Sequence, residues 1–332
     1  MAYTTIDNPE LYFQTKLYTG NYSTQSITLD GSENMQPDMI WIKERSVSGN
    51  HQLQDSVRGT NSKLMPNSND LEGTDTNYIT SFDSNGFSIG ANNGINQDGV
   101  TNVAWCWKKT ATAGFDIVTA TGTGSAKTIS HSLSAVPHVI ISKEKTGSVN
   151  DWVVYHHKNT SAPETDKLIL NENNATSDDS CWNDTTPTSS VFSVSGASVV
   201  NRSSSTYVYY LFSEKQGFSK FGSYTGNGNA NGPFVYTGMK SSFIMLKETS
   251  GTSDWSIYDN KREPFNVADS TLEANTSDAE AVVSGRPIDI LSNGFKLRGD
   301  SSYTNESGAS YIYMAFAESP FVSSGGISTN AR

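Results

Sequence analysis

The sequence predicts an all-β protein of three tandem antiparallel β-sandwiches, jelly-roll or concanavalin-like, each of about 100 residues. Three observations predict this fold. An Ile-x-x-Lys-Glu pattern recurs at 40–44, 140–144 and 244–248, at intervals of 100 and then 104 residues. An aromatic segment closes each repeat. Apolar residues are 35% and charged residues 17% of the chain, so Ser, Thr, Asn and Gly supply its polarity, as in turn-rich β proteins.

The recurring pattern is a strand that we expect to be covered on both faces. In 39–42 consecutive residues are apolar, which indicates a strand between its partner sheet and another layer. The Lys-Glu pair is interpreted as a structural feature of the repeat. The residues that hold equal places are Ile40, Lys43, Glu44, Ile140, Lys143, Glu144, Ile244, Lys247 and Glu248.

Further parallels flank this strand. A phenylalanine follows a turn in each repeat, at Phe87, Phe192 and Phe295, and aromatic strands follow at 103–107, 208–212 and 312–316. We expect these phenylalanines, like the three isoleucines, to be buried at matching places.

The ends of the aromatic strands set the domain boundaries. We predict an N-terminal arm at 1–15, repeats at 16–109, 115–215 and 218–321, and a C-terminal tail at 322–332. The repeats are called unit one, unit two and unit three below. Because the linkers are short, we expect a semi-rigid row of domains.

Charge and hydropathy exclude several classes of partner. The chain has 34 Asp and Glu against 23 Lys and Arg, a net charge of -11, and no basic stripe suited to a nucleic acid. No apolar run is long enough to insert in a membrane, and residues 1–5 lack the plan of a signal peptide. We therefore expect a soluble protein made in a cytoplasm.

Few residues suggest chemistry. Cys106 and Cys181 fall at unequal places in their repeats, which favours two free thiols over a disulfide or zinc site. The segment 122–128 resembles a phosphate loop but lacks its spacing and helix. His156 and His157 are interpreted as a surface pair, and the carboxylate pair 178–179 lies in a polar loop. The sequence predicts no enzyme, no cofactor and no metal.

Aromatic residues are the candidate ligand-binding residues. Trp152 and Tyr155 follow the repeated lysine of unit two as Trp255 and Tyr258 follow that of unit three, while unit one has His51 at the tryptophan position. One interpretation places these rings in a core. The other makes each unit a lectin-like module whose rings stack on sugars, with repetition adding avidity.

Five segments of unit one resemble a repeat of virion proteins from marine bacteriophages, usually described as tail-fibre or virion-appendage components with a concanavalin-like or SPRY-like β-sandwich. The resemblance is weaker in units two and three, where 156–159 and 259–262 replace the Asp-x-x-Arg-Gly step. Asp55 and Arg58 of that step are interpreted as a buried pair that fixes a loop. The segments are 18–21, 37–43, 55–59, 81–90 and 103–108.

The resemblance implies a structural protein of the virion, a tail, fibre or appendage component, that binds a host-surface glycan or a neighbouring virion protein. The alternatives are a capsid decoration or fibre-shaft protein without a ligand, and a surface-polysaccharide depolymerase. We also expect a homotrimer, with residues 1–15 contacting another virion protein.

Overall fold

Antiparallel strands form most of the regular structure of residues 3–330, which the computed structural model describes, and the all-β prediction is confirmed. The larger sheets of the three units begin with one common strand order. They contain β1 (Phe13–Thr19), β9 (Thr101–Trp107), β3 (Met39–Glu44) and β4 (Gln52–Asp55) in unit one; β10 (Phe115–Thr121), β17 (Thr206–Phe212), β12 (Val139–Glu144), β13 (Val153–His156), β14 (Asp166–Ile169) and β15 (Ser177–Asp178) in unit two; and β18 (Ser219–Thr225), β26 (Ser310–Pro320), β20 (Met239–Glu248), β21 (Ser256–Asp259), β22 (Ser270–Glu273) and β23 (Ala281–Val282) in unit three.

Each unit also has a smaller sheet and a one-turn α-helix. The smaller sheets contain β2 (Gln25–Thr28), β8 (Gly86–Ile89) and β7 (Ile79–Asp83); β11 (Lys127–Ser130) and β16 (Val191–Val194); and β19 (Phe234–Tyr236), β25 (Gly294–Leu297) and β24 (Ile288–Leu291). The remaining elements are β5 (Ser62–Lys63) and β6 (Gly73–Thr74), the helices α1 (Asn93–Asn96), α2 (Ser198–Asn201) and α3 (Ser302–Asn305), and the 3-10 turns η1 (Pro9–Leu11), η2 (Pro163–Thr165) and η3 (Ser180–Trp182).

The larger and smaller sheets of each unit enclose a hydrophobic core. Ile40, Ile140 and Ile244 lie in these cores, each 0% exposed, and pair across the sheet with the same position of β9, β17 and β26. Phe87, Phe192 and Phe295 are also buried there. The prediction of matching burial is therefore confirmed.

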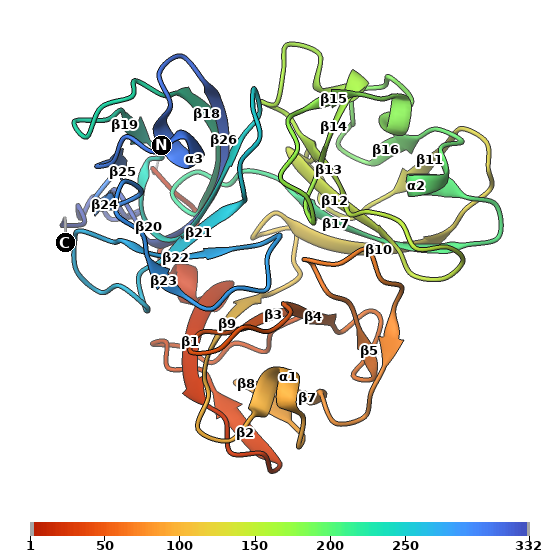
Figure 1. Cartoon of the computed structure of the whole chain (residues 1–332), viewed down its shortest axis with the longest axis horizontal. Coiled ribbons are helices and arrows are strands. Elements are labelled where there is room, and N and C mark those ends of the chain that lie inside the picture. The colour runs from red at the N-terminus through yellow and green to blue at the C-terminus, as the bar shows by residue number, and fades with distance from the viewer. Residues whose placement is uncertain (1–2, 331–332) are drawn as a thin grey trace.

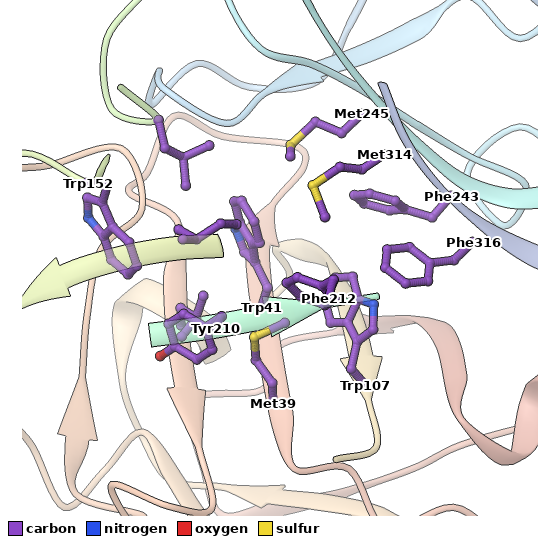
Figure 2. A pocket seen from close by; sticks show the side chains of 13 residues that line it. Met39, Trp41, Trp107, Trp152, Tyr210, Phe212, Phe243, Met245, Met314 and Phe316 are labelled. Atoms are coloured by element: carbon purple, nitrogen blue, oxygen red, sulfur yellow. The ribbon is translucent and has the colours of Figure 1, made fainter. Parts of the chain in front are cut away.

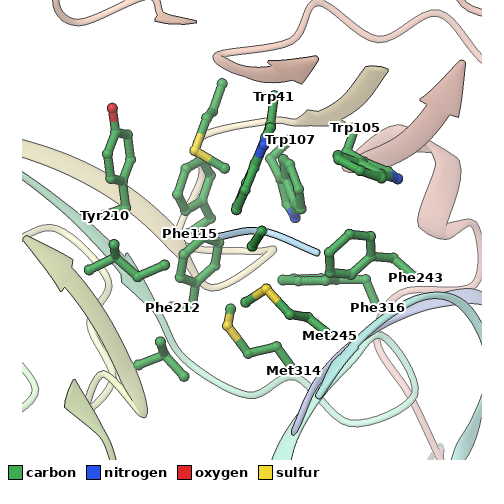
Figure 3. Packing of buried hydrophobic residues seen from close by; sticks show 14 of the residues in the cluster. Trp41, Trp105, Trp107, Phe115, Tyr210, Phe212, Phe243, Met245, Met314 and Phe316 are labelled. Carbon is green, nitrogen blue, oxygen red and sulfur yellow. The ribbon is translucent and has the colours of Figure 1, made fainter. Parts of the chain in front are cut away.

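The opposite face of each larger sheet is buried as well, because neighbouring residues of a strand point to opposite faces. These faces meet in one cluster, the central core, and the three units surround it as three lobes (Figures 1 and 3). The expected row of domains is therefore wrong. The central core includes Trp41, Trp105 and Trp107 of unit one, Ile141, Trp152, Tyr210 and Phe212 of unit two, and Phe243, Met245, Met314 and Phe316 of unit three.

A cavity of about 20 Å³ remains where the three lobes meet (Figure 2). Side chains from all three units point into it, among them Trp41, Phe212 and Met314. A water molecule would fit this volume but needs polar partners, and the lining is made of apolar and aromatic side chains. The cavity is therefore a packing defect of the central core, not a ligand site.

Equivalent backbone hydrogen bonds join each unit to the next and close the ring. The amide of Glu72 donates to the carbonyl of Lys145 at 3.1 Å, joining unit one to unit two. Thr176 N donates to Thr249 O at 3.0 Å between units two and three. The amide of Glu280 donates to the carbonyl of Arg45 at 2.8 Å and joins unit three to unit one.

The N-terminal segment packs on the protein itself. Ile6 is 2% exposed and belongs to the central core, Thr4 Oγ1 donates to the carbonyl of Gln216, and β1 already begins at Phe13. At the other terminus the amide of Ser324 donates to Asp7 Oδ1 at 2.6 Å, so both ends lie against unit three (Figure 1). Residues 3–15 are therefore not a free arm.

Replacing Ile6 by alanine should lower the free energy of unfolding by about 2–5 kcal/mol, since the change leaves a cavity in the central core. Ile327 offers a matched control because its side chain is 75% exposed, and its change to alanine should alter stability by less than about 0.5 kcal/mol. Denaturant unfolding of both variants measures the difference. Equal free energies of unfolding for the two variants would show that the N-terminal segment does not stabilise the assembly of the three units.

Candidate functional site

The Lys-Glu signature lies buried at the junctions between units. Each lysine is at most 1% exposed, and burial lowers the pKa of Lys43, Lys143 and Lys247 to about 8. Lys143 Nζ donates to the carbonyl of Asn69 in unit one at 2.9 Å, and Lys247 Nζ donates to the carbonyl of Asn173 in unit two at 3.2 Å. Two of the three signature lysines therefore help to hold neighbouring units together, whereas Lys43 Nζ donates to the carbonyl of Glu44 in its own unit.

The tryptophans of the lectin hypothesis are buried at the same junctions. Trp152 is 0% and Trp255 2% exposed. Trp152 Nε1 donates to the carbonyl of Met65 at 3.0 Å, and Trp255 Nε1 donates to that of Ile169 at 2.9 Å. His51, at the tryptophan position of unit one, has Nε2 2.9 Å from the carbonyl oxygen of Glu273.

Tyr155 and Tyr258 lie in the cores of their own units, 3% and 1% exposed. Together with the tryptophans they present no open ring face to a sugar. The lectin interpretation of these four residues is therefore replaced by the core interpretation.

The buried pair of Asp55 and Arg58 recurs in unit three. Arg58 Nε donates to Asp55 Oδ2, and Arg262 Nε to Asp259 Oδ2, each at 2.5 Å with both side chains fully buried. Each aspartate also accepts from a neighbouring unit: Tyr210 Oη donates to Asp55 and Trp105 Nε1 to Asp259. This geometry agrees with the interpretation of the pair as structural. Unit three differs from the Asp-x-x-Arg-Gly pattern of unit one only at the glycine.

His156 takes the aspartate position in unit two and is not a surface residue. It is 1% exposed, and its Nε2 lies 3.2 Å from the carbonyl oxygen of Tyr313 in unit three. His157 Nε2 lies 2.6 Å from the carbonyl oxygen of Phe221. Burial lowers the pKa of His156 to about 3 and that of His157 to about 4, so both imidazoles are neutral at pH 7.

Clefts of 280–420 Å³ lie at the junctions, each lined by residues from two units. We call them the 1–2, 2–3 and 3–1 clefts after the units that form them. Gln14, Asp116 and Lys220, which occupy one register position of β1, β10 and β18, line the 3–1, 1–2 and 2–3 clefts respectively. The three clefts therefore differ in charge at an equivalent point.

The 2–3 cleft is the largest, at 420 Å³, a size typical of small-molecule sites. It combines a cation, a carboxylate, an imidazole and two phenol rings. Its lining consists of Tyr3, His138, Glu214, Gln216, Gly217, Ser219, Lys220, Tyr236, Thr237 and Gly238.

Hydrogen bonds fix the polar groups of the 2–3 cleft. Lys220 Nζ donates to Glu214 Oε2 at 2.8 Å, and the other carboxylate oxygen accepts from the amide of Phe221 at 2.9 Å. His138 Nδ1 accepts from the amide of Glu214, so the neutral ring carries its proton on Nε2. Tyr3 Oη lies 3.2 Å from Tyr236 Oη.

This arrangement is suited to binding a polar molecule. Donors and acceptors held in place beside aromatic rings can recognise hydroxyl groups without ordering flexible side chains first. Glu214 is the single carboxylate of the cleft lining and is already paired with Lys220, whereas a glycosidase uses two carboxylates. Within residues 3–330, no cluster of three His, Cys, Asp or Glu could hold a metal ion, and no helix is long and apolar enough to cross a membrane.

Sequence reasoning identified the junction residues as repeated but did not predict the clefts. It also missed the one-turn helices, whose buried last residues are Asn96, Asn201 and Asn305. Their side-chain amides bind backbone carbonyls of the preceding loops, as in Asn96 Nδ2 to the carbonyl of Gly90 at 2.8 Å. The recurrence of asparagine at nearly the same interval as the Lys-Glu pair was a usable signal.

The fold and the site define an all-β protein in which three units share one core and form polar clefts at their junctions. The chain belongs to the family of the domain of unknown function DUF7483, which matches residues 8–320. No curated protein matches the chain.

Replacing Trp152 by alanine should lower the free energy of unfolding by about 3–5 kcal/mol, because it empties part of the central core. Trp152→Phe should cost less, about 1–3 kcal/mol, since it removes the donor to the carbonyls of unit one and part of the indole volume but keeps an aromatic ring in the core. Phe265→Ala, at a side chain that is 77% exposed, is the control. A wild-type melting temperature for Trp152→Ala would contradict the burial.

Acid should weaken the junction between units two and three. The pKa of His156 is about 3 in the folded chain and 6.5 in the unfolded chain, so the unfolded chain takes up the proton first as the pH falls below 6.5. The contribution of neutral His156 to the free energy of unfolding is therefore complete above pH 6.5 and declines as the pH falls toward 3. At pH 5 the loss is about 2 kcal/mol, from 1.36 kcal/mol per pKa unit.

Unfolding of His156→Gln between pH 5 and 8 provides the comparison, because glutamine can still donate to Tyr313 but does not titrate. His138, His157, Lys158 and Glu214 also face this junction and are unchanged in the variant. Parallel pH profiles for the two proteins would contradict the assignment to His156.

Proposed function

We propose that this protein is a non-catalytic structural component of a bacteriophage virion, in the tail, a fibre or an appendage, and that it binds a host-surface glycan. The observation that carries the binding role is the 2–3 cleft, where Lys220, Glu214 and His138 lie beside two tyrosine rings. Glycans present hydroxyl groups together with apolar C–H faces, and this lining offers partners for both.

The virion role is supported by the resemblance of unit one to a repeat of marine bacteriophage virion proteins. The composition fits such a role, since Ser, Thr, Asn and Gly supply the polarity in place of charge. Homotrimer formation and contacts with other virion proteins belong to the same proposal. They are not needed to cover the central core, which the three units of one chain already enclose.

Glycan-array binding combined with an assay for released oligosaccharide tests the proposal. We expect binding to bacterial surface glycans without product release. Release of oligosaccharides would support the depolymerase alternative, and absence of binding would support a decoration or shaft protein without a ligand.

Replacing Lys220 by alanine should weaken glycan binding about tenfold or more, because it removes the cation of the 2–3 cleft. The melting temperature should stay within a few degrees of wild type, since this ion pair is partly exposed and contributes little to stability. Lys16→Ala removes a comparable pair with Asp30 outside the clefts and is the control. Equal affinities of the two variants would place the ligand elsewhere.

A further inference from the structure

Two large aromatic side chains project from the outer face of the smaller sheet of unit three. Phe234 is 46% and Tyr236 53% exposed, and both lie on β19, the edge strand of that sheet. Residues i and i+2 of a strand share a face and lie about 6.6–6.8 Å apart along it. The two rings therefore stand side by side on one surface.

The fold does not require aromatic residues at these positions. Val235, between the two rings, pairs with the repeated Phe295, as Ile27 pairs with Phe87 and Ile129 with Phe192. The neighbours of Ile27 and Ile129 are small polar residues, which form the same strand: Ser26, Thr28, Thr128 and Ser130. The aromatic pair is thus a departure of unit three from the other two units.

A glycine and charged residues lie beside the two rings. Tyr236 pairs with Gly294, which has no side chain, and a Cβ there would lie 3.0 Å from Cε2 of Phe234. Phe234 pairs with Lys296, and Asp289 on the next strand forms a 3.2 Å ion pair with Arg298. Charged groups therefore border the two rings.

Tyr236 also lines the 2–3 cleft, so the two features form one continuous surface. Tyr236 belongs to both features, and Lys220, Glu214 and His138 line the cleft with it. A ligand of several linked rings could contact both parts at once.

We propose that Phe234 and Tyr236 form a stacking platform for the pyranose rings of an oligosaccharide whose hydroxyl groups reach the 2–3 cleft. The proposal rests on the glycan-binding role proposed above and assigns it to unit three. A sugar chain matches two rings bordered by charges, whereas an apolar protein partner calls for a larger contiguous apolar patch. A peptide strand added at β19 would gain few hydrogen bonds, because that strand is three residues long.

The double variant Phe234→Ser with Tyr236→Thr tests the platform, since it installs the residues of unit one in a strand that still forms. We titrate each full-length protein with the glycan that wild type binds best on an array. The proteins are wild type, the single variants Phe234→Ser and Tyr236→Thr, and the double variant. We expect the double variant to lose at least about tenfold in affinity while its melting temperature stays near that of wild type. Tyr236→Phe should keep most of the affinity because it keeps the ring, and Phe265→Ala should change nothing.

The outcomes separate the two proposals. Wild-type affinity in the double variant would overturn the platform and leave glycan binding through the clefts intact. If the wild-type protein binds no glycan, the proposed function fails and the platform fails with it. If the double variant unfolds, the single variants decide, and unchanged affinity in both would overturn the platform.

Discussion

The burial of both faces of the three larger sheets is the constraint on which the rest of the structure depends. Strands β3, β12 and β20 are buried along nearly their whole length. The smaller sheet of a unit covers only one face, so Trp41, Ile141 and Met245 would face water in a row of separate sandwiches. Each such side chain contributes about 1.5–3 kcal/mol when buried, so association of the three units is strongly favoured. A single unit is therefore not an independent domain.

Hydrophobic burial has no direction, and the polar contacts at the junctions set how the units meet. Lys143, Trp152 and the carbonyl of Lys145 bind residues 65–72 of unit one, and their counterparts repeat this at the next junction. Burying an ammonium group is costly, and the lowered pKa of Lys143 shows that cost. The carbonyl of Asn69 offsets part of it only when unit one is correctly placed.

The sequence was sufficient for the buried strands because each of those predictions rested on a short period. Consecutive apolar residues around Ile40 predicted burial on both faces, and the repeated phenylalanines predicted matching cores. The arrangement of the units could not be predicted, because nothing in the local pattern of Trp41 states which neighbour covers it. The role of Trp152 was ambiguous for the same reason. Polar residues flank a tryptophan that stacks on a sugar, and they also flank a tryptophan that donates a hydrogen bond at a junction.

Comparison of the repeats distinguishes residues that join the three units from residues that differ between them. At the tryptophan position of each junction the side chains make equivalent contacts with a backbone carbonyl, even where the residue changes from Trp152 and Trp255 to His51. At the cleft position that is equivalent in all three units, the residues are Gln14, Asp116 and Lys220, which differ in charge. Three such clefts therefore do not form three copies of one site. The repetition provides the shared core, and the proposed recognition falls at outer positions at which the units differ.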